Sequence, residues 1–330
     1  MIDTSKGRYW DLPWSLVDGC APCSPGCDHC WAAAMAKRFN PDVTLQLLWI
    51  DKETGKPMPP AFNRKIITRP DRLSIPLKRR KPTVYAVWND WLHESVPYEF
   101  IAQMLDMACD VRCEHHTFLF LTKRPQRWEE FNFWYGENWP GDTASCVALD
   151  VIGKLPRNIF FGLTVCNQQE ANEKIPIFLQ VPGKKFLSIE PCLGPVWISG
   201  GLITGAGKYV GDAISRIDAV ILGGETGPGA RPLHPDWVRS VRDQCAAAGV
   251  PFFFKRRGEW SPEEPLKYCK LSGKRWSHES VSWARDGSIY NPLNPPPDHF
   301  PSVTVYRVGR NAAGRLLDGR THDELPWVKP

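Results

Sequence analysis

Six short runs of apolar, β-branched and aromatic residues recur along the middle of the chain. They lack polar alternation, which is the pattern of strands that are buried on both faces. Such strands belong to parallel sheets that are covered by helices, so the runs predict an α/β protein. The predicted strands are Val84–Trp88, Thr117–Leu121, Ile159–Leu163, Lys185–Ile189, Ala219–Leu222 and Pro251–Phe254.

Helical patterns separate the predicted strands. Prolines stand where a first turn tolerates them, and Gly249 stands where a helix can end. The expected helices are Trp31–Phe39, Tyr98–Cys109, one beginning near Pro125, Gln169–Leu179 and Pro235–Ala248. The repeated alternation of strand and helix predicts a complete or partial (β/α) barrel, of the TIM barrel type, over residues 1–255.

Two segments do not follow this repeat. Residues 47–62 are expected to form an inserted hairpin with Glu53–Lys56 as its turn. The tail, residues 256–330, is rich in proline, glycine and arginine and contains no further strand–helix unit. We expect it to form an irregular C-terminal cap that packs on the barrel and is not a separate domain.

Composition restricts the setting in which the protein works. No run of eighteen apolar residues occurs, which excludes a membrane-spanning helix. The first residues lack a basic segment followed by an apolar one, so a cytoplasmic location is expected. In that reducing compartment the eleven cysteines are expected to remain thiols or to bind metal. The net charge of +5 permits a nucleic-acid or nucleotide partner without requiring one.

Four cysteines, Cys20, Cys23, Cys27 and Cys30, lie close together in a loop rich in glycine and proline. The last three have the spacing C-x3-C-x2-C, and replacing Cys23 by Cys20 gives C-x6-C-x2-C. Either trio could bind three irons of a [4Fe-4S] cluster, because such clusters are held by cysteine thiolates. The fourth iron would then be open to the amino and carboxylate groups of S-adenosylmethionine.

Zinc is the alternative metal for this loop. Four thiols arranged as two C-x2-C pairs suit a tetrahedral zinc ion. The pairs are separated by only three residues, Ser24–Gly26, which is short for the usual two-knuckle site. We therefore favour an iron–sulfur cluster. His29 is expected to face solvent, and the isolated Cys166 and Cys192 are expected to be buried structural thiols.

Charged and hydrogen-bonding residues follow almost every predicted strand. Parallel α/β folds bind ligands at this edge of the sheet, so these residues are candidates for holding cofactor or substrate. The glycine-rich stretch Gly223–Gly229 could bring backbone amides close to an anion, but it lacks the Gly-Lys-Ser/Thr ending of an ATPase loop. The candidates are Asp90, Lys123, Glu190, Gly223, Gly224 and Glu225.

Several longer motifs resemble the phage gene product thirty-seven / sixty-eight family, whose function is unknown. The matching segments are Gly19–Cys20, Ser24–Ala32, Leu92–Glu94, Val96–Pro97, Leu121–Pro125, Ser188–Pro191, Leu193–Pro195, Gly223–Pro232, His234–Trp237 and Gly314–Gly319. The resemblance implies a radical S-adenosylmethionine type of fold. It also implies the longer cysteine spacing, which falls on Cys20, Cys27 and Cys30 and leaves Cys23 as an addition.

These observations lead to one main hypothesis and two others. The first is a radical S-adenosylmethionine enzyme that generates a 5′-deoxyadenosyl radical and modifies a nucleotide or DNA base, with flavodoxin or ferredoxin as electron donor. The second is a zinc- or cluster-stabilised nucleic-acid-binding protein without catalytic activity. The third is a metal-free hydrolase or lyase that uses Glu190, Glu225 and Lys255, which would leave the cysteine loop unexplained.

Overall fold

The computed structural model describes residues 2–45, 60–138, 156–199, 211–263, 279–284, 288–290 and 301–328. The hairpin expected at 47–62 lies almost entirely outside these residues. At its base, Thr44 pairs with Phe62 in an antiparallel bridge.

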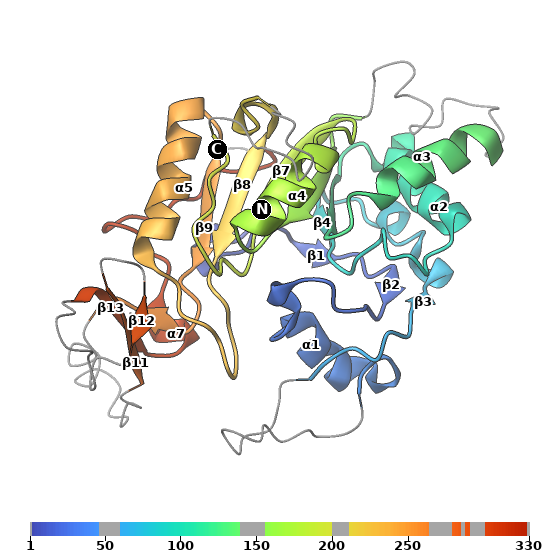
Figure 1. Cartoon of the computed structure of the whole chain (residues 1–330). Coiled ribbons are helices and arrows are strands. Elements are labelled where there is room, and N and C mark those ends of the chain that lie inside the picture. Colours follow the sequence, from blue (N-terminus) through green and yellow to red (C-terminus); the bar gives the residue numbers. More distant parts are fainter. Residues whose placement is uncertain are drawn as a thin grey trace.

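Seven parallel strands form one curled, open sheet within the described residues (Figure 1). They are β1 (Leu12–Pro13), β4 (Val84–Val87), β5 (Thr117–Thr122), β6 (Ile159–Thr164), β7 (Lys184–Ile189), β8 (Ala219–Gly223) and β9 (Phe252–Arg256). Their order in the sheet follows their order in the chain, as in a (β/α) barrel. The six predicted strands are confirmed to within two residues. The barrel is partial, because β1 and β9 are the edges of the sheet.

The edge strand β1 was not predicted from the sequence. It pairs with β4 through only two residues, Leu12 and Pro13. Proline has no amide hydrogen to donate, so it is found at sheet edges and seldom in central strands. A strand this short leaves no periodic pattern to recognise.

Helices α2 (Tyr98–Cys109), α3 (Arg127–Asn138), α4 (Gln168–Phe178) and α5 (Pro235–Ala248) cover the outer face of the sheet (Figure 1). Helix α1 (Trp31–Phe39) lies apart from the strands beside the 3-10 helix Pro41–Val43, and the short α7 (Arg310–Ala313) contacts Trp260–Ser261 of the tail. Short 3-10 helices span Thr4–Lys6, Pro25–Cys27, Pro41–Val43, Pro70–Arg72, Pro76–Lys78, Val111–Cys113 and Ile214–Arg216. All five helices expected from the sequence are present. The end of α5 is set by Gly249, whose φ of 68° is left-handed.

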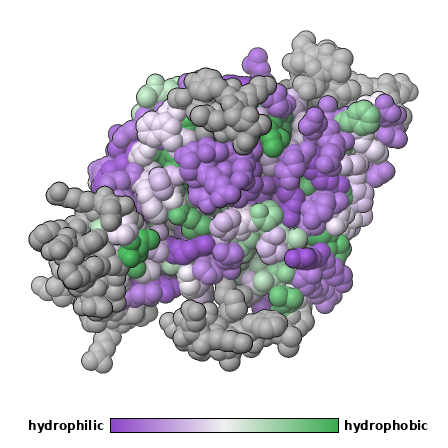
Figure 2. Space-filling view, viewed as in Figure 1, coloured by the Kyte–Doolittle hydropathy of each residue, from purple (hydrophilic) through white to green (hydrophobic). Residues whose placement is uncertain are grey.

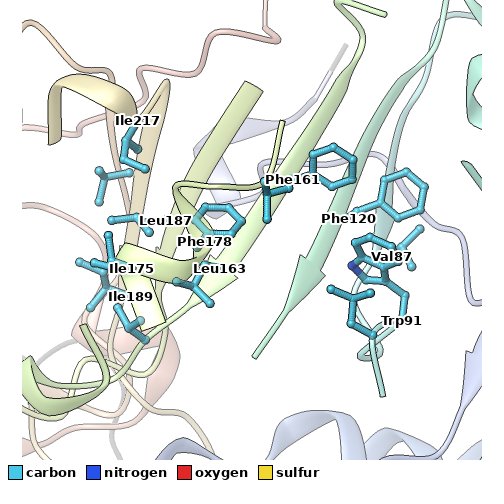
Figure 3. Packing of buried hydrophobic residues seen from close by; sticks show 14 of the residues in the cluster. Val87, Trp91, Phe120, Phe161, Leu163, Ile175, Phe178, Leu187, Ile189 and Ile217 are labelled. Carbon is cyan, nitrogen blue, oxygen red and sulfur yellow. The ribbon is translucent and has the colours of Figure 1, made fainter. Parts of the chain in front are cut away.

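Alternate residues of each strand build a large apolar layer between the sheet and the helices. Figure 3 shows Phe120, Phe161 and Leu187 directed to one side of the strands. The ring of Trp91, in the loop after β4, stacks on Phe161 at a centroid distance of 5.8 Å. Burying each such side chain stabilises the fold by about 1.5–3 kcal/mol. This layer holds the strand ends in fixed positions.

The intervening residues point to the inner face, and the two ends of the chain cover them. The ring of Trp327 lies 4.9 Å from that of Phe160 and 5.5 Å from that of Phe186. Its indole nitrogen donates a hydrogen bond of 2.8 Å to the carbonyl oxygen of Tyr9. Gly162 faces the same side, where a Cβ atom would lie 2.2 Å from the Phe186 ring. The inner face is therefore filled by chain segments that are remote in sequence.

The tail is more regular than expected. It contains a four-stranded antiparallel sheet in the order β10–β13–β11–β12 within the described residues. Its strands are β10 (Trp260–Ser261), β11 (Ser280–Ala284), β12 (Ile289–Tyr290) and β13 (Pro301–Arg307), and a smaller sheet pairs β2 (Val17–Asp18) with β3 (Ile67–Thr68). The expectation of an irregular cap is wrong for this part. Short alternating segments such as Ser280–Ala284 were hidden by a composition rich in proline and glycine.

Among the described residues, no helix has both the length and the apolar character that a membrane span requires. The face in Figure 2 is predominantly hydrophilic, with apolar residues in separate small areas.

We expect Gly162→Ala to lower the free energy of unfolding by about 1–3 kcal/mol, because the added methyl group would overlap the buried Phe186 ring. The matched control is Gly136→Ala on the exposed side of α3, where a Cβ atom meets nothing within 4 Å. That change should raise stability by about 0.5–1 kcal/mol. Urea denaturation of both variants measures the difference, and equal stability of Gly162→Ala and wild type would contradict the inner-face packing.

Candidate functional site

A cavity of about 380 Å³ opens at the carboxyl ends of the strands. This size is within the usual range for small-molecule sites. The residues that line it include Cys20, Cys27 and Cys30 of the cysteine loop and Asp90, Lys123, Glu190, Gly224 and Glu225 of the strand ends. Of the residues selected from the sequence, only Cys23 and Gly223 are outside this lining. The fold thus brings the cysteine loop and the strand ends together.

A buried ion pair attaches the first half of the cysteine loop to β5. The Asp90 carboxylate, 7% exposed, accepts hydrogen bonds of 2.6 Å from the Thr122 hydroxyl and 2.7 Å from Arg124 Nη1. Arg124 Nη2 donates a hydrogen bond of 2.9 Å to the carbonyl oxygen of Ala21. Asp90 therefore positions the arginine that holds the loop.

A second buried ion pair attaches the other half of the loop to β8. Glu225 accepts from Arg231 Nε at 2.9 Å and from Arg231 Nη2 at 2.7 Å. The same Nη2 donates to the carbonyl oxygen of Pro25 at 2.7 Å. His29 Nδ1 lies 3.0 Å from Glu225 Oε2, so the expectation that His29 faces solvent is wrong. The carboxylate that follows β8 draws this histidine inward.

The charge state of Glu225 depends on its partners. Burial alone would raise the pKa of this carboxyl group. Hydrogen bonds from Arg231 and His29 outweigh that effect and hold the pKa below its ordinary value of 4.5. Glu225 is therefore ionised at neutral pH, and its charge is neutralised where it is buried.

Gly26 lets the cysteine loop rest directly on the ends of β6 and β7. A Cβ atom at this position would lie 2.4 Å from Cys166 Sγ and 3.0 Å from Pro191 Cδ. Cys166 and Cys192 are buried free thiols, as predicted. By contrast, Cys109 is disulfide-bonded, so the expectation that every cysteine would stay a thiol or bind metal is wrong at that position.

The four cysteines of the loop are free thiols, but they do not share one environment. Cys20, Cys27 and Cys30 line the main cavity, whereas Cys23 is exposed and lines a separate cavity with His93. A hydrogen bond with the Cys23 thiol lowers the pKa of Cys27 to about 6. Burial, followed by the charge of Asp90, raises the pKa of Cys20 to about 12. Cys20, Cys27 and Cys30 thus line one cavity, and Cys23 lines another while its thiol stays in contact with that of Cys27.

The cysteine loop offers sulfur donors to a metal group. Thiolates bind zinc as one tetrahedral ion, and they bind an iron–sulfur cluster with each cysteine on a different iron. Cys20, Cys27 and Cys30 line the cavity, so three thiols are available to such a group. Among the described residues, no group of three or more His, Cys, Asp or Glu side chains lies close enough together to hold a metal ion.

Lys123 adds a positive charge beside the thiols. Its side chain makes no hydrogen bond or ion pair with another described residue. Burial lowers its pKa, but attraction to the neighbouring cysteines Cys166 and Cys27 raises it by more, so the net shift is upward. A charged ammonium group is therefore available to an anionic ligand in the cavity.

Glu190 is already engaged by neighbours. Its carboxylate lies 3.0 Å from Lys255 Nζ and accepts a hydrogen bond of 3.4 Å from the Tyr9 hydroxyl. A Cβ atom at Gly223 would lie 2.7 Å from Glu190 Oε1, and one at Gly224 would lie 2.1 Å from the carbonyl oxygen of Arg257. Close packing therefore requires glycine at both positions.

Two tryptophans complete the wall and were missed in the sequence. Trp31 and Trp88 line the cavity, with ring centroids 4.9 Å apart and an interplanar angle of 40°. Trp31 is 48% exposed, so part of its surface is free for a ligand. The sequence contained a signal for both tryptophans in their positions beside selected site residues. Trp31 follows Cys30 directly, and Trp88 precedes Asp90 by two residues. An aromatic pair of this kind offers a stacking surface for a base.

A family model described as "Protein of unknown function (DUF5131)" matches residues 4–326. No curated protein and no solved structure matches the chain.

We expect Glu225→Gln to lower the free energy of unfolding by about 2 kcal/mol at pH 7, because it removes charged hydrogen bonds. The pKa of Glu225 in the folded state lies below its ordinary value of 4.5. Ionised Glu225 therefore contributes fully to the free energy of unfolding above pH 4.5, and this contribution is lost as the pH falls through the folded-state pKa. The difference between variant and wild type should therefore shrink in acid, as measured by urea denaturation at several pH values. Glu137→Gln, at an exposed position, is the control, and a pH-independent difference for Glu225→Gln would refute this account.

Proposed function

We propose that this chain, which belongs to the DUF5131 family of proteins of unknown function, is a radical S-adenosylmethionine enzyme that modifies a nucleotide or DNA base. One observation carries the proposal. Three thiols of a single loop line a cavity at the carboxyl edge of an open parallel half barrel. Catalytic sites of barrel folds lie at that edge, and iron–sulfur clusters are held by cysteine thiolates.

The proposed cluster ligands are Cys20, Cys27 and Cys30. These three share the cavity, and their C-x6-C-x2-C spacing is the one that the family resemblance implies. Cys23 lines the other cavity and is proposed to remain a free thiol. The thiolates of Cys20, Cys27 and Cys30 would hold the cluster, and the cluster would pass one electron from the external donor to the sulfonium of S-adenosylmethionine. Breaking the S–C5′ bond would give methionine and a 5′-deoxyadenosyl radical, which would take a hydrogen atom from the substrate.

The remaining residues have binding and positioning roles in this proposal. Lys123 would hold a carboxylate of the cofactor, because its ammonium group lies beside the cysteine loop and lacks a partner among the described residues. Trp31 and Trp88 would stack on a base. Asp90 and Glu225 act through Arg124 and Arg231 and keep the loop in place.

The ligand set can be tested by anaerobic reconstitution of single-cysteine variants. Wild type should contain about four iron and four sulfide ions per chain and, with dithionite or with flavodoxin or ferredoxin as donor, should form 5′-deoxyadenosine. Cys20→Ala, Cys27→Ala and Cys30→Ala should each lose most of the iron and the product. Cys23→Ala is the matched control and should keep both.

Two results would count against the proposal. A colourless protein with one zinc ion per chain, lost equally in all four variants, would support the zinc-stabilised alternative. Salt-dependent nucleic-acid binding that survives removal of iron but not of zinc would then point to a non-catalytic binding protein.

Lys123→Gln should weaken S-adenosylmethionine binding about tenfold or more, because a charged hydrogen bond contributes about 1.5–3 kcal/mol. The iron content should stay at the wild-type level, since Lys123 is not a proposed ligand. Equilibrium binding to the reconstituted protein measures the change. Lys65→Gln, at an exposed position outside the cavity, controls for the loss of one positive charge. Equally weakened S-adenosylmethionine binding in both variants would show that Lys123 does not bind the cofactor.

A further inference from the structure

Three arginines line the cavity at the β9 edge of the sheet. They are Arg8 from the N-terminal segment, Arg256 at the end of β9 and Arg310 at the start of α7. The side chains of Arg8 and Arg310 are exposed and make no ion pair or hydrogen bond with any described residue. Arg256 donates one hydrogen bond of 3.2 Å to the carbonyl oxygen of Lys6, while its buried Nε has no partner.

A β-bulge helps to direct Arg256 into the cavity. Leu222 pairs with Phe254, but the next residue, Gly223, pairs with Arg256, so Lys255 is an extra residue in β9. Bulges of this kind change the direction of the side chains that follow. As a result, the neighbouring residues Lys255 and Arg256 both line the cavity.

The nearby carboxylates are occupied by other groups. Glu190 is paired with Lys255 at 3.0 Å. Glu259 accepts hydrogen bonds from the backbone amides of Gly227 at 2.9 Å and Arg310 at 3.0 Å. Burial lowers the pKa of Arg256, and the positive charges of Arg310 and Arg315 lower it further. The carboxylates of Glu190 and Glu259 offset this lowering only in part. Among the described residues, no carboxylate thus forms an ion pair with Arg8, Arg256 or Arg310, and Glu190 and Glu259 act on Arg256 only through longer-range attraction.

We propose that Arg8, Arg256 and Arg310 bind the phosphate group of the substrate, which is a nucleoside 5′-monophosphate. Guanidinium groups match the geometry of phosphate oxygens and bind them by paired hydrogen bonds. One compact cluster at the cavity rim suits a single phosphate, whereas a polynucleotide is followed by a row of contacts. The same cavity holds the Trp31–Trp88 pair, which can stack on the base. This inference relies on the proposed function for the reaction, but the binding can be measured without it.

The test measures binding of the common nucleoside 5′-monophosphates to the reconstituted full chain by calorimetry, each beside its nucleoside. At least one monophosphate should bind about tenfold or more tightly than its nucleoside. The double variant Arg8→Gln/Arg310→Gln should abolish that preference and leave nucleoside binding unchanged. It should fold, because both side chains are exposed and unpaired within the described residues. Arg320→Gln, exposed and outside the cavity, is the control for loss of a surface arginine and should bind like wild type.

Three outcomes would overturn the inference. They are the absence of any phosphate preference, a double variant that keeps the preference, and arginine-dependent binding only of a single-stranded oligonucleotide of about twelve nucleotides. Repeating the titration on cluster-free protein separates this inference from the proposed function. Arginine-dependent phosphate binding in a chain that never binds iron or cleaves S-adenosylmethionine supports the inference and rejects the proposed function. Cleavage of S-adenosylmethionine by a chain that shows no phosphate preference supports the proposed function and rejects this inference.

Discussion

Two buried pairs of a carboxylate and an arginine hold the cysteine loop against the sheet, and the candidate site depends on them. Asp90 holds Arg124, whose guanidinium reaches the carbonyl oxygen of Ala21. Glu225 holds Arg231, which reaches the carbonyl oxygen of Pro25. Removing one partner of such a pair destabilises the fold, because the other charge is left without compensation. A loop without regular strands thus acquires a fixed position at the cavity.

The same constraint explains why the strand ends are charged. The loop could not stay at the carboxyl edge without partners for its backbone carbonyl groups, since buried polar groups require hydrogen bonds. Ionised residues at the ends of β4, β5 and β8 supply them directly or through an arginine. Two of the residues selected as ligand-binding candidates are therefore anchors, and Lys123 is left with no partner among the described residues. The site combines a rigid frame with a positively charged side chain, Lys123, beside the thiols.

Much of the fold could be predicted because its signals are local. Runs such as Ile159–Leu163 show burial on both faces, and Pro235 and Gly249 mark the ends of a helix. Elements without a local signal were missed, among them β1 with two residues and the antiparallel sheet of the tail. The packing of Trp327 against Phe160 joins segments that are far apart in the chain, so no local pattern could show it.

The sequence by itself determined the strand–helix alternation and the position of four cysteines in one short loop ahead of it. It could not decide which cysteines act together, because spacing limits how far thiols can reach but not where they point. The tertiary structure places Cys20, Cys27 and Cys30 in the lining of the main cavity and Cys23 in the lining of a separate one. The physical reason is that the loop is oriented by arginines from β5 and β8, whose contacts with Ala21 and Pro25 span more than a hundred residues.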